Sequence, residues 1–405
     1  MKICIPVLMG LEAVVGRELE RLGFDKEDVT KQDGLVYLEA PADREELSDV
    51  IAKLNVNLAA GERVMLEVAR GDVRSFDDLF DLTQVIPWER FIPEDYPFTI
   101  QGYTINSQLS SVPACQRTIK KGQVVRLREA RGLDEEAVLP EDPSLPGIHI
   151  QFALIHNEIS FRIDTSGSSL HKRGYRLQAT EAPIKETLAA GMLELTRWSA
   201  FADEAVWDPF CGSGTLIIEA ALHAAGLAPG ARRRFTGERW PYLEAEAFDR
   251  AREEALNAAD MEPPEQPFLI GTDVDPEAIE IARINAKRAG VDGFCRFEVM
   301  DIADMDLRTV RELTGLDRIM IFTNPPYGER IGTEEEVYIL NRMLASKALA
   351  GGQLKRGVRL FAISANDYFE KDINARADKR RKLYNGMIKC TFFQYFRRPK
   401  REQGS

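Results

Sequence analysis

The amino-acid sequence predicts an α/β protein: its second half is a doubly wound parallel sheet, and two smaller α+β units precede it. From residue 203 onward, short apolar stretches alternate with helical patterns, which is typical of βαβ units and hence of a parallel sheet. One of these stretches runs into a turn with two glycines and then into an apolar, alanine-rich helix. Residues 1–65 and 66–165 are instead each predicted to form a small α+β unit. We therefore expect three domains, at 1–65, 66–165 and 166–405.

Composition narrows the class of protein. The chain has 405 residues, of which 44% are hydrophobic and 29% charged, and its formal net charge is −12. This acidic balance argues against indiscriminate binding to nucleic acid. Five scattered cysteines without C-x-x-C spacing and four histidines without a spaced pair indicate neither disulfides nor a metal site. The scattered cysteines fit a reducing environment, so we expect a protein of the cytoplasm. No apolar stretch is long enough to span a membrane.

The first unit carries no cluster of catalytic residue types. Its pattern predicts strands at 2–8 and 34–39 and helices at 10–22 and 44–54. The second unit is predicted to contain helices at 76–85 and 111–127, a strand at 98–107, and a hairpin whose strands lie at 148–156 and 159–164.

Basic side chains gather in three places despite the acidic total. Residues 117–131 hold six basic residues and one acid, and Lys120, Lys121 and Arg126 are among them. Residues 376–401 hold ten basic residues and one acid. Such patches on an acidic body indicate contact with a polyanion, and the alternative for each is a solvated surface run.

The third basic cluster follows a stretch at 166–169, Ser-Gly-Ser-Ser, that we expect to be a flexible hinge. Basic and aromatic residues interleave there, which suits single-stranded or flipped nucleotides; a charged linker is the alternative. The candidates for RNA contact in this cluster are His171, Lys172, Arg173, Tyr175 and Arg176.

Strands of the parallel sheet are expected at 204–208, 267–273, 294–300, 317–323 and 357–363, with a final pair near 387–396. An insertion at 229–267, whose start is again basic and aromatic, separates the first two. Ligands of such sheets bind outside the carboxyl ends of the strands, at the switch point of the topology. The residues that follow each strand are therefore the candidates for a site.

The first strand ends in Asp208-Pro209-Phe210-Cys211-Gly212-Ser213-Gly214-Thr215. This is no dinucleotide fingerprint, because Ile217 stands where a third glycine is required, and no phosphate-binding loop is present. An acid four residues before a G-x-G turn suits a ligand with an amino-acid end and a ribose. The motif resembles the first motif of class I S-adenosylmethionine-dependent methyltransferases.

Acids follow the second and third strands. Asp273 can accept both hydrogen bonds of a ribose diol, whereas Asp275 is better placed to cap the helix that begins at Pro276. Asp301 could accept from an adenine amino group, although acids after strand ends are common.

Asn324-Pro325-Pro326-Tyr327 follows the fourth strand and is the most specific signal in the chain. Two prolines remove backbone donors, so that carbonyl oxygens and the Asn324 side chain can accept both protons of a planar amino group. Tyr327 offers a flat face on which a base can stack. Such a site works by positioning and preorganised hydrogen bonds, with a methyl sulfonium as the electrophile.

Together these two motifs resemble those of the THUMP-domain class I RNA guanine-N2 methyltransferases, in particular proteins similar to the N-terminal half of the bifunctional bacterial 23S rRNA methyltransferase. The segments Leu170 to Arg176, Lys185-Glu186-Thr187 and Arg381 to Gly386 match as well. The resemblance covers nearly the whole chain and implies a ferredoxin-like domain at 1–65, a THUMP RNA-binding domain at 66–165 and a Rossmann-like methyltransferase domain at 166–405.

The resemblance also implies site residues. Catalytic roles fall to Asn324, Pro325 and Tyr327, and RNA contact to the helix that carries Lys120, Lys121 and Arg126. The implied cofactor, S-adenosylmethionine, would be held by Asp208, Cys211, Gly212, Gly214, Thr215, Asp273, Val274, Asp301, Glu186 and Thr187.

We therefore expect an enzyme that transfers a methyl group to the exocyclic N2 of a guanine in 23S rRNA and releases S-adenosylhomocysteine. Three alternatives stay open: the same chemistry on tRNA, methylation of a protein glutamine, and a non-catalytic RNA-binding assembly factor. The expected partner is RNA, with no membrane and no metal; the sequence does not indicate the oligomeric state.

Overall fold

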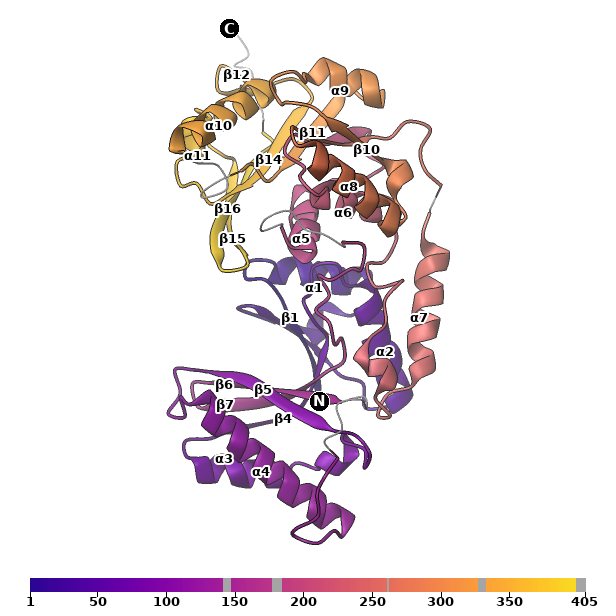
Figure 1. Cartoon of the computed structure of the whole chain (residues 1–405), viewed down its shortest axis with the longest axis vertical. Helices are drawn as coiled ribbons and strands as arrows, with labels where there is room; N and C mark the ends of the chain where they lie inside the picture. The colour runs from indigo at the N-terminus through magenta and orange to yellow at the C-terminus, as the bar shows by residue number, and fades with distance from the viewer. Residues whose placement is uncertain (141–146, 177–183, 261, 327–332, 398–405) are drawn as a thin grey trace.

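The structure is a computed structural model that describes residues 1–140, 147–176, 184–260, 262–326 and 333–397. The molecule is elongated, with the C-terminal half of the chain forming one lobe and a helix-covered sheet forming the opposite end (Figure 1). In the described part of the chain, no helix combines the length and the apolarity that a membrane span requires.

One seven-stranded sheet runs through both N-terminal units. Its order is β2-β3-β1-β4-β7-β6-β5, and every pair is antiparallel except β5 with β6. The strands are β1 (Lys2–Pro6), β2 (Val29–Gln32), β3 (Leu35–Glu39), β4 (Met65–Asp72), β5 (Phe98–Ile105), β6 (Ile148–Ile155) and β7 (Glu158–Asp164). The predicted boundary at 65/66 coincides with the start of β4, which pairs with β1 on one side and β7 on the other.

Among the described residues, these units contain four α-helices: α1 (Glu12–Arg21), α2 (Arg44–Asn57), α3 (Phe76–Val85) and α4 (Val112–Arg131). Local sequence explains their ends. Ser75 and Asp78 form a capping box at the start of α3, and Gly132 ends α4 in the left-handed conformation. The predicted hairpin turn is at His156 and Asn157, which both have positive φ, as a two-residue hairpin turn requires.

The C-terminal lobe contains the predicted doubly wound sheet, in the order β10-β9-β8-β11-β14-β16-β15. Its strands are β8 (Glu204–Asp208), β9 (Leu269–Asp273), β10 (Cys295–Val299), β11 (Arg318–Thr323), β14 (Val358–Ser364), β15 (Lys379–Asn385) and β16 (Ile388–Tyr395). The first five run parallel, and β16 and β15 are antiparallel additions at one edge. The topology reverses at β8, which lies between β9 and β11.

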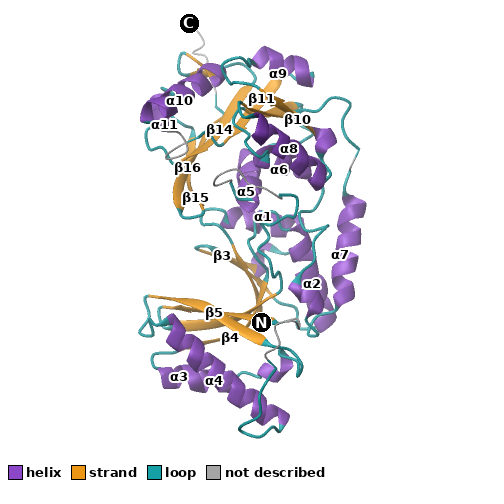
Figure 2. Cartoon of the chain, in the orientation of Figure 1, coloured by secondary structure: helices purple, strands orange, loops and turns teal. Residues whose placement is uncertain are grey.

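Helices cover both faces of this sheet (Figure 2). They are α5 (Glu186–Thr196), α6 (Thr215–Ala224), α8 (Pro276–Ala289), α9 (Leu307–Thr314), α10 (Glu334–Ala348) and the short α11 (Phe369–Asp372); a small ribbon, β12 (Leu349–Ala350) and β13 (Gln353–Leu354), follows α10. Side chains of β8 alternate between the two cores: Val206 packs with α6, whereas Ala205 and Trp207 pack with α9 and α10.

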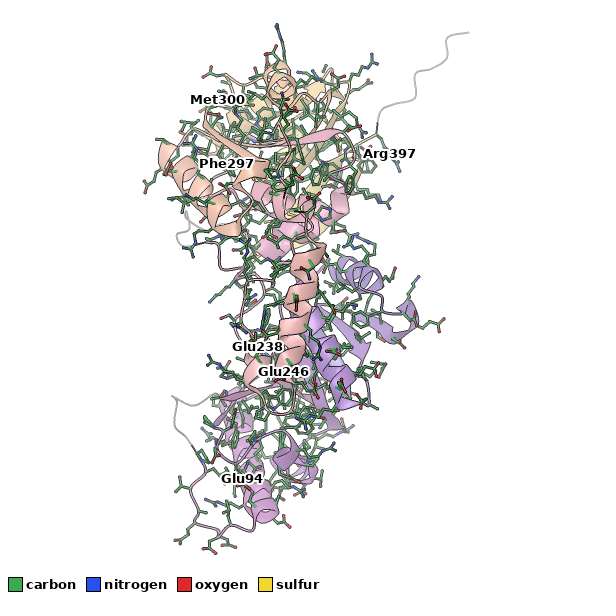
Figure 3. The ribbon with its side chains drawn as sticks, turned by 90° about the vertical axis from the view of Figure 1, so that its right-hand side faces the viewer. Glu94, Glu238, Glu246, Phe297, Met300 and Arg397 are labelled. Carbon is green, nitrogen blue, oxygen red and sulfur yellow. The ribbon has the colours of Figure 1, made fainter. Side chains whose placement is uncertain are left out.

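The insertion between β8 and β9 ties the two ends of the molecule together. Its helix α7 (Ala245–Ala258) packs along α2, and the side view shows Glu238 and Glu246 on this segment between the lobes (Figure 3). Arg250 forms an ion pair with Asp49 at 2.6 Å, and Trp240 Nε1 donates to the Phe91 carbonyl at 2.7 Å. The basic and aromatic start of the insertion therefore serves contacts between domains.

The segment at 166–169, predicted to be a flexible hinge, is instead held by hydrogen bonds. Ser166 is buried, and its Oγ donates to Asn55 Oδ1 at 2.6 Å and accepts from the Val64 amide at 2.8 Å. Arg233 of the insertion donates to the Ser168 carbonyl at 2.8 Å. The prediction was wrong because all these partners come from distant parts of the chain, which local composition does not reveal.

Candidate active site

A cavity of about 510 Å³ opens at the carboxyl ends of β8, β9 and β11, the switch point of the parallel sheet. Its lining includes eight of the predicted site residues: Asp208, Cys211, Gly212, Thr215, Asp273, Val274, Asp301 and Asn324. Pro209, Phe210, Ile184, Pro326 and Leu340 also line it and were not predicted. Predicted residues from four separate segments of the sequence thus line one cavity.

The turn after β8 is fixed at both ends by backbone hydrogen bonds. The Cys211 amide donates to the Thr272 carbonyl, and the Gly214 amide donates back to the Cys211 carbonyl at 2.9 Å. Gly214 has a φ of +84°, and a β-carbon there would lie 3.0 Å from the side chains of Ala282 and Phe297. Gly214 does not line the cavity. The position therefore requires glycine because the chain packs closely against α8 and β10 there, and not because a ligand approaches the backbone.

Asp208 is buried at the end of β8 and accepts a hydrogen bond from Thr323 Oγ1 at 2.7 Å, which joins it to the end of β11. Burial raises the pKa of this carboxyl to about 7, against the opposing effect of the bonds from Thr323 and the Phe210 amide. A cationic ligand group beside this carboxyl would favour its ionised form and lower its pKa.

Asp273 connects two parts of the cavity. One carboxylate oxygen accepts from the Gly212 amide at 2.8 Å and the other from the Asp275 amide at 3.1 Å. A carboxylate has about four acceptor positions, so two stay available for a diol. Asp275 caps α8 by accepting from the Glu277 amide, as predicted. Asp301 is exposed at the rim, with one oxygen bonded to the Ala303 amide.

Asn324 carries the most informative unpaired atom of the site. Its side-chain Oδ1 is buried and has no hydrogen-bond partner among the described residues. Asn324 and Pro326 both line the cavity. A buried acceptor without a partner is rare in native proteins, and here it fits a donor brought by a ligand. Pro325 is buried beside it and does not line the cavity; Tyr327 lies outside the described residues.

Two predicted cofactor residues lie behind the cavity wall rather than in it. Glu186 is buried and forms an ion pair with Arg176 at 3.3 Å, and Arg176 donates to Thr215 Oγ1 at 2.6 Å. Thr187 donates its hydroxyl hydrogen to Glu62 of the N-terminal unit. Arg176, predicted to contact RNA, therefore braces the start of α6 from behind.

The other residues of the cluster at 170–176 that were predicted to contact RNA differ in whether their side chains are buried. Arg173 and Tyr175 are buried, Arg173 pairing with Glu219 at 3.4 Å and Tyr175 donating to the same carboxylate at 3.1 Å. The prediction that these two contact RNA is wrong because their side chains do not reach the surface. Lys172 is exposed, and His171 is half-buried beside Glu62.

On α4, Lys121 is exposed, and its ammonium lies 5.4 Å from the centre of the Phe80 ring. Lys120 lies 3.5 Å over the Phe98 ring, and Arg126 forms an ion pair with Glu89. Lys121 is therefore the most exposed of the three residues of α4 that were predicted to contact RNA.

Three family models match the chain: an RlmL ferredoxin-like domain at residues 2–65, a THUMP domain at 73–135 and an RMKL-like methyltransferase domain at 173–394. The last match covers more than half of the chain. The protein belongs to the RMKL-like methyltransferase family. The predicted fold, with ferredoxin-like and THUMP units before a class I methyltransferase domain, is confirmed.

Named relatives extend this result. YpsC of Bacillus subtilis, provisionally named an RNA methyltransferase, is 35% identical over 98% of this chain and 96% of its own length. The ribosomal RNA large subunit methyltransferase K/L of Syntrophotalea carbinolica is 33% identical over 82% of this chain, which spans only 46% of that relative. The solved structure of SMU.472, provisionally described as a methyltransferase, was determined with S-adenosylhomocysteine. It is 32% identical, covers 98% of this chain and 99% of its own, and superposes with a TM-score of 0.86.

Proposed function

We propose that this protein methylates the exocyclic N2 of a guanine in large-subunit ribosomal RNA. The observation that carries the proposal is the buried, unpaired Oδ1 of Asn324 at the cavity wall, immediately before two prolines. An exocyclic amine is the donor that such an acceptor lacks. The K/L relatives support a ribosomal RNA substrate, and the THUMP match supports RNA as the substrate class.

The methyl donor is S-adenosylmethionine. The cavity fits it: the Asp208 carboxyl faces the ammonium group of its amino-acid end, two acceptor positions of Asp273 suit its ribose, and Asp301 at the rim suits its adenine. When bound, it supplies a methyl group on a positively charged sulfur, which is the electrophile of the reaction.

The residues of this chain act on the amine. Asn324 Oδ1 accepts one N–H, and the Pro325 carbonyl is the proposed second acceptor, since Pro326 offers no competing backbone donor. Holding both protons turns the nitrogen lone pair toward the cavity. The amine nitrogen then gains the methyl group as the carbon–sulfur bond breaks, S-adenosylhomocysteine leaves, and the displaced N2 proton passes to water. Tyr327 is the proposed stacking face for the base.

Three alternatives differ in substrate or in catalysis. Methylation of tRNA uses the same residues, and methylation of a protein glutamine uses the same trap on a side-chain amide. An assembly factor without catalysis would need no cofactor at all. The family match to a methyltransferase domain and the intact acceptor at Asn324 favour catalysis, and the THUMP match favours RNA.

The test is to incubate the full chain with labelled S-adenosylmethionine and, separately, unmodified large-subunit rRNA and unmodified tRNA, followed by nucleoside mass spectrometry. The proposal expects label in N2-methylguanosine from rRNA. Label in tRNA would keep the mechanism and replace the substrate, and label in N6-methyladenosine would contradict the guanine assignment. We expect the reaction to occur in the cytoplasm.

A further inference from the structure

The hairpin β15–β16 extends beyond the edge of the sheet at which the cavity opens. In the ladder, Thr323 at the end of β11 is level with Ala362 of β14, and Ala362 is level with Phe393 of β16. Because β16 runs antiparallel, the residues before Phe393 continue past the carboxyl ends of the parallel strands. Met387 at the turn is six positions before Phe393, which corresponds to about 20 Å of ribbon at ~3.3 Å per residue. Figure 1 shows β15 reaching from the methyltransferase lobe toward the N-terminal units.

One face of this ribbon packs on the rest of the protein. Leu383 and Cys390 are directly opposite in the ladder, and both are buried. Arg381, which shares their face, donates to the Gly10 carbonyl at 2.6 Å, and Gly10 lies against Leu383. The N-terminal unit therefore supports the ribbon from behind and fixes its position.

The opposite face is basic and aromatic. Lys382 and Tyr384 alternate with the buried residues along β15, and Lys389 is directly opposite Tyr384 on β16. Lys382 and Lys389 are exposed, and within the described part of the chain neither forms an ion pair. The Lys382 ammonium lies 5.2 Å from the centre of the Tyr384 ring. The two ammonium groups flank an aromatic ring, and neither is in an ion pair among the described residues. This arrangement is complementary to a phosphate backbone with bases beside it.

The turn presents an apolar side chain at its tip. Met387 is 99% exposed, and its neighbour Ile388 is 44% exposed. What sets Met387 apart from other exposed apolar residues such as Phe201 is its place at the tip of a basic ribbon, where it is free to contact a nucleic acid bound by that ribbon. Proteins that open nucleic-acid helices use such apolar side chains as wedges between base steps.

From this placement we infer that the β15–β16 hairpin is the element that opens the RNA next to the target base. Lys382 and Lys389 hold phosphates on the exposed face, and Met387 enters the base stack, so that the neighbouring guanine can leave it and reach Asn324. Removal of a base from its stack is required before its exocyclic amine can enter a cavity of this kind. The inference rests on the proposed function for the identity of the substrate as RNA.

The phosphate contacts are tested by binding, independently of catalysis. The full chain carrying Lys382→Glu and Lys389→Glu is titrated with unmodified large-subunit rRNA over a range of salt concentrations. The control carries Lys26→Glu and Lys287→Glu, two exposed lysines on other elements, and has the same net charge. Loss of two phosphate contacts lowers the slope of log K against log salt by about 1.8, at ~0.9 per contact in a duplex. A slope equal to that of the control overturns the inference.

The wedge is tested by cross-linking and by rate. Irradiation of the wild-type complex with 4-thiouridine-substituted rRNA is expected to attach RNA to the peptide that contains Met387. Met387→Asp is expected to lower methyl transfer to folded rRNA by about 10-fold or more, since unstacking of a base step is no longer compensated, with unchanged affinity for S-adenosylmethionine.

The matched control is Phe201→Asp, which changes an equally exposed apolar residue next to the amino end of β8. Cross-links confined to other peptides, or a Met387→Asp rate equal to that of Phe201→Asp, overturns the wedge. If the wild-type protein binds rRNA without methylating it, the proposed function fails, and the salt slope and the cross-links still decide the hairpin.

Discussion

Replacing Arg173 by alanine separates a structural role from an RNA-binding role for the cluster at 170–176. The Arg173 side chain is 2% exposed and joins three parts of the chain. It donates to the Ala59 carbonyl of the N-terminal units, to the Leu170 carbonyl of the linker at 2.8 Å, and to Glu219 of α6 at 3.4 Å. Loss of this side chain therefore removes a connection between domains.

The size of the effect follows from what the substitution leaves behind. Burial raises the pKa of the Glu219 carboxyl, and Arg173 is the main influence that opposes this rise. Without Arg173, the hydroxyl of Tyr175 is the one hydrogen-bond partner that the carboxylate keeps among the described residues, in a site with 2% side-chain exposure. Removal of one partner of a buried ion pair destabilises proteins by about 3–5 kcal/mol. We expect Arg173→Ala to lower the free energy of unfolding by that amount.

The assay is urea denaturation of Arg173→Ala, with Lys172→Ala as the matched control, because Lys172 is adjacent and exposed. A second variant, Arg173→Met with Glu219→Leu, removes both charges and is expected to be less destabilised than Arg173→Ala alone. The reasoning is refuted if Arg173→Ala unfolds at the same urea concentration as Lys172→Ala but binds rRNA more weakly.

Three further substitutions test the site and the turn beside it. Asn324→Ala is expected to lower the methyl-transfer rate by about 10²-fold or more with unchanged cofactor affinity, as when one preorganised polar contact is lost; equal single-turnover rates would contradict the amine trap. Asp208, with a pKa raised to about 7, binds its proton more tightly in the folded state than in the unfolded one. Its contribution to the unfolding free energy therefore falls as the pH rises from about 4 to 7 and is constant above that range; calorimetry of Asp208→Asn is expected to show a weaker fall. Affinity for the cationic cofactor is expected to rise over pH 6–8 in the wild type and not in Asp208→Asn, as isothermal titration would show. Gly214→Ala places a β-carbon 3.0 Å from Ala282 and Phe297 at a φ of +84° and is expected to lower the unfolding free energy by about 1–3 kcal/mol; an unchanged denaturation midpoint would show that the turn relaxes freely.

Strands and motif positions were predictable from the sequence where the signal is local. The parallel strands were predicted to within two residues, because each is a short apolar stretch bounded by polar turn residues. Asp208, Asp273 and Asn324 follow three of these strands, and the rule that ligands bind at the carboxyl ends brings them into one cavity. The helix cap at Asp275 was predictable for the same local reason.

Pairings between distant residues were not predictable. The basic cluster at 170–176 has the composition of an RNA-binding segment, but Glu219, 46 residues after Arg173, turns it into a buried connection. Likewise, β4 was missed because its partners β1 and β7 lie on both sides of the expected domain boundary. In each case the structure depends on a contact between residues far apart in the sequence, and neither composition nor periodicity reveals such a contact.

Nucleoside mass spectrometry of RNA methylated by the wild-type protein tests the central claim most directly. Unmodified large-subunit rRNA and labelled S-adenosylmethionine are incubated with the wild-type chain and with Asn324→Ala in parallel. The account predicts label in N2-methylguanosine with the wild type and a loss of about 10²-fold or more with the variant. Label in another nucleoside, or equal labelling by the two proteins, would contradict it.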